Sequence, residues 1–165
     1  MDVKQIRTIV FVCQWNEGRS AHLELSTRHK LRETGSDMEI ISAGLSQGGG
    51  VNQLRKDFLL QRDVPLDEIE EHRSTLFNEE HAKADLILVA ELHMKDELLT
   101  KWPELEGKVM TVRGFIHGFT PEDEPLNAYE AQIVDSAGHT DGEKLELYRE
   151  LESFADRVVE RLASD

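Results

Sequence analysis

The fold of this chain is decided by the stretch IRTIVFVCQWNEGRS, residues 6–20. Its first part, residues 6–12, is a nearly continuous run of β-branched and aromatic residues, which predicts a strand buried on both faces. A helix is expected over residues 20–34, where Gly35 ends it. Residues 13–19 are therefore expected to form a tight loop between a buried strand and the N-terminus of a helix.

The alternation of strand and helix continues along the chain. Further strands are expected at residues 38–42, 85–89 and 108–112. Helices are expected at residues 52–62, 78–83 and 93–102, and from a Thr140-x-x-Glu143 capping box to Ala163. This pattern predicts the α/β class, with three α/β/α layers around a four-stranded parallel sheet. Ligands of such sheets bind at the carboxyl ends of the strands.

Two segments have no strand or helix pattern. The triplet Gly48-Gly49-Gly50 predicts a flexible loop. Residues 113–139 are expected to form an irregular loop, which is long for a compact domain, and its middle is acidic without any base. The length of 165 residues predicts one domain spanning residues 1–165.

Composition excludes several classes of protein. The net charge is -14, from 33 acidic against 19 basic residues, and it repels nucleic acid and anionic membranes at long range. No apolar run approaches a membrane span of about 20 residues, and no signal-peptide core is visible. The single cysteine, Cys13, excludes an internal disulfide framework and predicts a reducing, cytoplasmic location. The seven histidines lack metal-ligand spacing, so neither a metal nor a cofactor is expected.

The loop at residues 13–19 has the chemistry of an anion site. Backbone N–H groups between a strand and a helix N-terminus can point together at one phosphate group. Arg19 can add a planar, bidentate fork. The same positive field favours the thiolate form of Cys13, and a thiolate beside a phosphate ester is a nucleophile aimed at phosphorus. The second interpretation is that Cys13 is a small buried apolar residue and Arg19 an ordinary surface residue.

The residues around this loop resemble the low-molecular-weight protein tyrosine phosphatases. The resemblance starts from Val10-Phe11-Val12-Cys13 followed by Asn16, Arg19, Ser20 and Glu24, which is similar to the family's phosphate loop. It extends over residues 6–163 through segments that occur in the family's order: Ile41-Ser42-Ala43-Gly44, His72-Arg73-Ser74, Ala84-Asp85-Leu86-Ile87-Leu88, and Asp135 with Gly138 before the last helix.

The resemblance implies roles for individual residues. Cys13 would be the nucleophile, Arg19 the phosphate-binding arginine and Asp135 the general acid. The loop residues Gln14, Trp15, Glu17 and Gly18 would surround the phosphate, and a polar network would hold the loop in shape through Asn16, Ser20, Ser42 and His72. Without the resemblance, Ser20 is open to interpretation as a simple helix N-cap and Asp135 as an ordinary turn residue. For His72, a surface histidine is then the favoured interpretation.

Several positions depart from the family pattern. Trp15 stands where the family usually has a small residue, and Glu17 places a carboxylate in a loop that binds an anion. Gly18 replaces a residue that is commonly a second cysteine. Ser136 follows the acid where the family almost always has proline, and no tyrosine follows Asp135, although Tyr129 in the long loop is a possible substitute.

The sequence thus predicts a cysteine-dependent phosphomonoester hydrolase, similar to protein tyrosine phosphatases, that forms a phosphocysteine intermediate. Its expected partner is a phosphorylated protein or a small phosphomonoester. The alternative is a phosphate-binding regulatory module with little or no turnover, which the departures at Trp15, Glu17 and Ser136 favour. Arsenate reduction is a weaker alternative, because a thiol relay needs more cysteines than Cys13. The natural substrate and the oligomeric state do not follow from the sequence.

Overall fold

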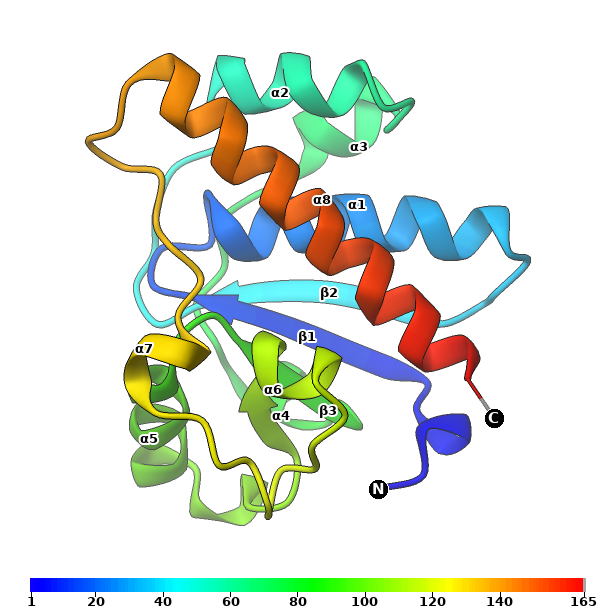
Figure 1. Cartoon of the computed structure of the whole chain (residues 1–165), viewed down its shortest axis with the longest axis vertical. Helices are drawn as coiled ribbons and strands as arrows, with labels where there is room; N and C mark the ends of the chain where they lie inside the picture. Colours follow the sequence, from blue (N-terminus) through cyan, green and yellow to red (C-terminus); the bar gives the residue numbers. More distant parts are fainter. Residues whose placement is uncertain (165) are drawn as a thin grey trace.

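A computed structural model describes residues 1–164 of the chain (Figure 1). Four parallel strands form one sheet in the order β2-β1-β3-β4. Their bounds are Thr8–Cys13 for β1, Glu39–Gly44 for β2, Leu86–Val89 for β3 and Val109–Thr111 for β4. Helices lie on both sides of this sheet, which confirms the predicted α/β class and the four-stranded parallel sheet.

The longer helices largely follow the sequence periodicity. They are α1 (Arg19–Glu33), α2 (Gln53–Leu60), α5 (Leu92–Lys101) and α8 (Asp141–Ala163). Shorter helices are α3 (Leu66–Glu71), α4 (Glu79–Ala82), α6 (Val112–Ile116) and α7 (Ala128–Ala131), with 3-10 turns η1 (Val3–Gln5) and η2 (Pro103–Leu105). None of the helices in residues 1–164 combines the length and apolar character that crossing a membrane requires.

The long segment at residues 113–139 is more ordered than the sequence predicted. It contains α6 and α7, and its acidic middle is tied to the sheet by Glu124, whose Oε2 accepts hydrogen bonds from the backbone N and Oγ1 of Thr111 at 2.8 and 3.0 Å. Farther along, the backbone N–H of Ile133 donates to the carbonyl of Ala90, just after β3. The expected irregular loop is thus interrupted by two short helices, and residues 133–136 are brought to the carboxyl edge of the sheet.

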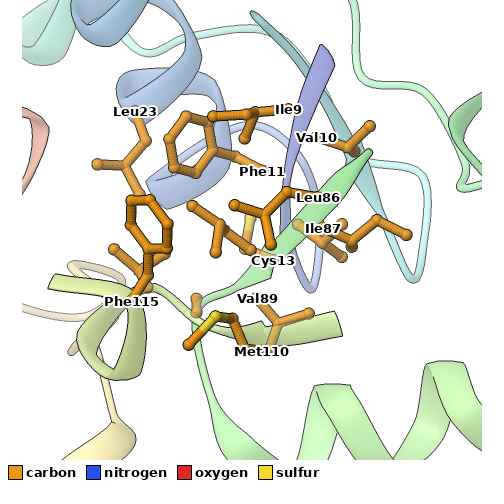
Figure 2. Packing of buried hydrophobic residues seen from close by; sticks show 14 of the residues in the cluster. Ile9, Val10, Phe11, Cys13, Leu23, Leu86, Ile87, Val89, Met110 and Phe115 are labelled. Carbon is orange, nitrogen blue, oxygen red and sulfur yellow. The ribbon is translucent and has the colours of Figure 1, made fainter. Parts of the chain in front are cut away.

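The core explains why β1 is central. Every residue from Ile9 to Cys13 is buried in the main core cluster. Figure 2 shows several of these side chains, such as Phe11 and Cys13, among those of neighbouring elements, which include Leu23 on α1, Leu86 on β3 and Phe115 on α6. Helix α8 crosses α1 at an angle in Figure 1 and packs on it through a face that includes the buried Leu151, Phe154 and Val158. This packing holds the end of β1 and the start of α1 in one place, so the loop between them has a rigid frame.

Candidate active site

The phosphate loop, Cys13 to Arg19, joins the end of β1 to the first residue of α1. Cys13 is 3% exposed, and its Sγ lies 3.0 Å from Ser20 Oγ. Within residues 1–164, no protein acceptor takes the backbone N–H groups of residues 14–19. Unpartnered amides at a helix N-terminus beside a sulfur atom provide donors for an anion.

Asn16 fixes the shape of this loop. Its φ of 51° lies in the left-handed region, which asparagine tolerates better than most residues. The Asn16 side-chain amide donates to Ser20 Oγ and Ser42 Oγ, both at 2.8 Å, and its Oδ1 accepts from the backbone N of Thr75 at 3.0 Å. The polar network implied by the resemblance is thus assembled around one buried side chain.

His72 completes the network from the segment after α3. Its Nε2 donates to the backbone carbonyl of Asn16 at 2.9 Å, and its Nδ1 lies 3.2 Å from Glu24 Oε2. Burial disfavours a charged imidazole, but the hydrogen bonds to Glu24 and to the Asn16 carbonyl outweigh burial and raise the pKa of His72 above its ordinary value. A protonated His72 can donate from both nitrogens, so it is a structural support and not an exposed surface histidine.

Arg19 is buried and oriented by two acceptors. Its Nη1 donates to Glu91 Oε2 and to the Ile133 carbonyl, both at 2.8 Å. Glu91 is the N-cap residue of α5 and follows β3. Since Nη1 is occupied, the Nε and Nη2 hydrogens of Arg19 are left to form a fork on a ligand.

Asp135 lies at the same site. Its Oδ2 is 3.8 Å from Arg19 Nη2, its Oδ1 accepts from the backbone N of Ala137 at 3.0 Å, and half of its side chain is exposed. Asp123, the other candidate for the acid, instead accepts both hydrogen bonds of Thr120, at 2.5 Å from the backbone N and 2.7 Å from Oγ1. A cavity of about 300 Å³ contains the acid and the nucleophile together; its lining includes Cys13, Trp15, Glu17, Gly18, Arg19 and Asp135.

The departures from the family pattern have structural explanations. Trp15 is 48% exposed at the rim of the cavity, so it does not crowd the loop. Glu17 Oε2 accepts the backbone N–H of Gly49 at 2.5 Å, so that part of its negative charge is directed to the glycine triplet. A Cβ on Gly48 would lie 2.5 Å from the Trp15 carbonyl, which is why a glycine is needed there. Gln14 Nε2 donates to Ser46 Oγ at 2.9 Å, away from the nucleophile.

Sequence reasoning missed two residues of the site, Glu91 and Arg55. Glu91 comes directly after the third predicted strand, where parallel sheets place functional side chains, so a signal was available. Arg55 on α2 also lines the cavity, and it is 0% exposed. Burial lowers the pKa of the Arg55 guanidinium, while Tyr148, Cys13 and Asp135 oppose that shift. Its position three and four residues before the buried Phe58 and Leu59 already placed it on the inward face of the helix.

Comparisons with known proteins identify the family. Solved structures with similar folds include the YwlE arginine phosphatase of Geobacillus stearothermophilus (25% identity over 94% of this chain and 92% of that chain, TM-score 0.77). A low molecular weight protein tyrosine phosphatase from T. tengcongensis is similar at 25% identity over 93% and 97%, also with a TM-score of 0.77. Wzb from Escherichia coli K30, solved with sulphate, shares the fold at 23% identity over 96% and 100%, with a TM-score of 0.76.

A search of curated protein sequences gave no match. The family model described as low molecular weight phosphotyrosine protein phosphatase, however, matches residues 8–133, which include the phosphate loop, Ser42, His72 and Glu91. That match covers most of the chain, and its first strand and loop are the segment around which the site is built. The chain therefore belongs to the low molecular weight phosphotyrosine protein phosphatase family.

Proposed function

We propose that this chain hydrolyses phosphomonoesters, including phosphotyrosine in proteins, through a phosphocysteine on Cys13. The observation that carries the proposal is the shared cavity in which a loop of unpartnered amides, Cys13, Arg19 and Asp135 meet. Membership of a family of cysteine-dependent phosphatases supports it. A single unpaired cysteine as nucleophile works under reducing conditions, so we propose a cytoplasmic location.

In the first step, Cys13 Sγ attacks phosphorus, the bond from phosphorus to the ester oxygen breaks, and Asp135 gives its proton to the departing oxygen. The loop amides and the free Nε and Nη2 of Arg19 hold the equatorial oxygens as charge develops on them. The hydrogen bond from Arg19 to Glu91 can persist while phosphate is bound, because it is donated by Nη1.

In the second step, water attacks phosphorus and the sulfur–phosphorus bond breaks. The Asp135 carboxylate takes the proton of the water, and inorganic phosphate leaves. Ser20 Oγ, 3.0 Å from Cys13 Sγ, is placed to donate a hydrogen bond to the departing thiolate. Asn16 supports this orientation, because its amide already occupies one lone pair of Ser20 Oγ.

The nucleophile is tested with p-nitrophenyl phosphate. Cys13→Ser is expected to abolish turnover while inorganic phosphate still binds. Peptides carrying phosphotyrosine or phosphoarginine, assayed side by side, identify the substrate class, since one of the structural neighbours is an arginine phosphatase. A folded wild-type protein that binds phosphate but turns over none of these substrates would contradict the proposal in favour of a phosphate-binding module.

The acid is tested through the leaving group. Asp135→Asn is expected to slow hydrolysis of phenyl phosphate by about 10²- to 10⁴-fold, and that of p-nitrophenyl phosphate less, because p-nitrophenolate leaves without a proton. Asp123→Asn is the matched control and should keep wild-type rates, since Asp123 is bonded to Thr120. Loss of phenyl phosphate hydrolysis in Asp123→Asn alone would move the acid to that residue.

A further inference from the structure

Arg55 is a buried cation beside the cavity that contains Cys13. Its Nη2 donates to Ser136 Oγ at 3.1 Å, and its guanidinium carbon lies 4.3 Å from the centroid of the Tyr148 ring. Its Nε and Nη1 are buried and have no hydrogen-bond partner. Within residues 1–164, no carboxylate forms an ion pair with Arg55. A buried guanidinium normally pairs with an anion, because removing its charge from water is unfavourable.

The guanidinium lies against the phosphate loop. A Cβ built on Gly18 would be 3.1 Å from Arg55 Nη1, so the glycine leaves room for the arginine head group. Gly18 is also the N-cap residue of α1 and the residue before Arg19. Both Gly18 and Arg55 line the cavity that contains Cys13. The unpartnered Nη1 is thus next to the amides that an anion would contact.

The charged groups around this cavity leave Arg55 without a paired carboxylate. The N-terminus of α1, Arg19, Arg55 and Lys144 are positive, while Glu17, Asp135 and the thiolate form of Cys13 are negative. Glu17 Oε2 accepts a hydrogen bond from the backbone N–H of Gly49. Asp135 Oδ1 accepts one from the backbone N–H of Ala137, and Asp135 Oδ2 lies 3.8 Å from Arg19 Nη2. Neither carboxylate pairs with Arg55.

We propose that Arg55 is a second arginine of the phosphate site and binds the phosphoryl dianion of the substrate together with Arg19. The inference rests on the proposed function in one respect, that the dianion is the substrate's phosphoryl group. Two guanidinium groups beside one loop select phosphomonoesters, which carry a dianion, over phosphodiesters, which carry a single charge. Gly18 and Arg55 are in close contact, since a Cβ at position 18 would press on Nη1 and displace the guanidinium slightly.

The test is a calorimetric titration of inorganic phosphate into the wild type and Arg55→Met. Met keeps an apolar stem against Tyr148 but removes the charge. A lost charge-assisted hydrogen bond predicts a Kd for phosphate about 10- to 100-fold weaker. Arg55→Lys should recover part of this affinity. Without phosphate, the Tm of Arg55→Met should equal or exceed that of the wild type, because an unpaired buried charge is gone.

Arg62→Met is the matched control. Arg62 also stacks on a ring, with its guanidinium carbon 3.5 Å from the Phe58 centroid, and donates to the Phe58 carbonyl, but it does not line the cavity. Its substitution should change the Kd for phosphate by less than about twofold, a difference under 0.5 kcal/mol. Ser136→Ala distinguishes binding of phosphate by Arg55 from anchoring of the Asp135 segment by Arg55. The variant removes the hydrogen bond from Arg55 Nη2 to Ser136 and leaves the charge of Arg55 in place.

Three outcomes would overturn the inference. One is a wild-type Kd for phosphate in folded Arg55→Met. Another is a Ser136→Ala variant that loses as much affinity as Arg55→Met, which would make Arg55 an anchor for the Asp135 segment. The third is an Arg55→Met chain that is unfolded or has a clearly lower Tm, which would make Arg55 a structural cation. Phosphate binding without turnover in the wild type would contradict the proposed function and leave this inference intact.

Discussion

At the scale of single residues, the phosphate loop depends most on Asn16. Its side chain reaches two hydroxyls and one backbone N–H, while its own carbonyl accepts from His72. A left-handed backbone in a non-glycine residue costs free energy, so the surrounding hydrogen bonds have to hold it. Asn16 therefore couples the conformation of the loop to β2 and to the His72 segment.

We expect Asn16→Ala to lower the free energy of unfolding by about 1–3 kcal/mol, because Ser42 and Thr75 lose buried partners. Turnover of p-nitrophenyl phosphate should fall as well, since Ser20 is no longer oriented. Asn16→Asp is the informative companion: it keeps the size and the acceptor for Thr75 but loses both donors. Urea unfolding and steady-state kinetics measure the two effects, and an Asn16→Ala chain with wild-type stability and rate would contradict this role.

Residue types at fixed spacings were sufficient to predict the phosphate loop. Its supports Asn16, Ser42 and His72 were expected only from the family resemblance, and Glu91 and Arg55 were missed. Cys13, Arg19 and Ser20 follow a strand within one short segment, and the structure brings them together. The assignments of their roles stay predictions until the variants are measured. Arg55 escaped prediction because charged residues in short helices are usually solvated, and nothing local shows that Gly18 leaves space for it.

At the scale of elements, the connection from β4 to α8 differs most from expectation. Its short helices have too few residues for hydrophobic periodicity, so pattern reasoning described a loop. One local feature that marks the start of α7 is a capping box. The side chain of Asn127 accepts a hydrogen bond from the backbone N–H of Glu130, and the side chain of Glu130 accepts one from the backbone N–H of Asn127. Tertiary contacts, such as that of Glu124 with Thr111, decide the remaining conformation.

Gly114 in α6 tests how firmly this connection is held. A Cβ at this position would lie 2.0 Å from Glu124 Oε2, the atom that accepts from Thr111. Gly114→Ala should therefore displace Glu124 and lower the free energy of unfolding by about 1–3 kcal/mol. Gly142→Ala in α8 is the control: its Cβ meets nothing within 4 Å, and alanine should stabilise that helix by up to about 1 kcal/mol. Equal effects of the two substitutions in urea unfolding would contradict the proposed contact.

At the scale of the whole molecule, net charge and local charge have opposite signs at the site. The chain carries a net charge of -14, yet its cavity is lined by the cations Arg19, Arg55 and Lys144 against the two carboxylates of Glu17 and Asp135, and the N-terminus of α1 adds positive potential. Composition predicts repulsion of polyanions at long range, and spacing predicts a local anion site; the two predictions concern different length scales and do not conflict. The fold class followed from alternating patterns along the chain, whereas the pairing of distant charges required the folded structure.

The stability of the folded chain should depend on pH through two buried histidine side chains that contact different partners. His22 on α1 contacts Glu152 of α8, and His72 contacts Glu24 of α1. His22 is fully buried against Glu152 of α8, at 2.9 Å, and burial lowers its pKa to about 4. The folded chain therefore binds fewer protons than the unfolded chain below pH 6.5, the ordinary value for histidine, and stability should fall from there to about pH 4. Burial, the largest single effect, would raise the pKa of Glu152, but the interactions with His22, Ser26 and Lys30 together outweigh it and lower that pKa to about 2, which extends the loss to lower pH.

His72 has the opposite sign. Because its folded pKa is raised, its contribution is fully present below pH 6.5 and is lost as the pH rises through the folded value. The Tm should thus be highest near pH 6.5 and decline on both sides. His22→Gln, which keeps a donor for Glu152 but does not titrate, should flatten the acid side above about pH 4.5, while His72→Gln should flatten the alkaline side. Thermal unfolding followed by circular dichroism from pH 3 to 9, at about 0.1 M salt to limit surface effects, measures both slopes. An unchanged acid slope in His22→Gln would mean that other groups, such as the buried His81 with its lowered pKa, control acid stability instead.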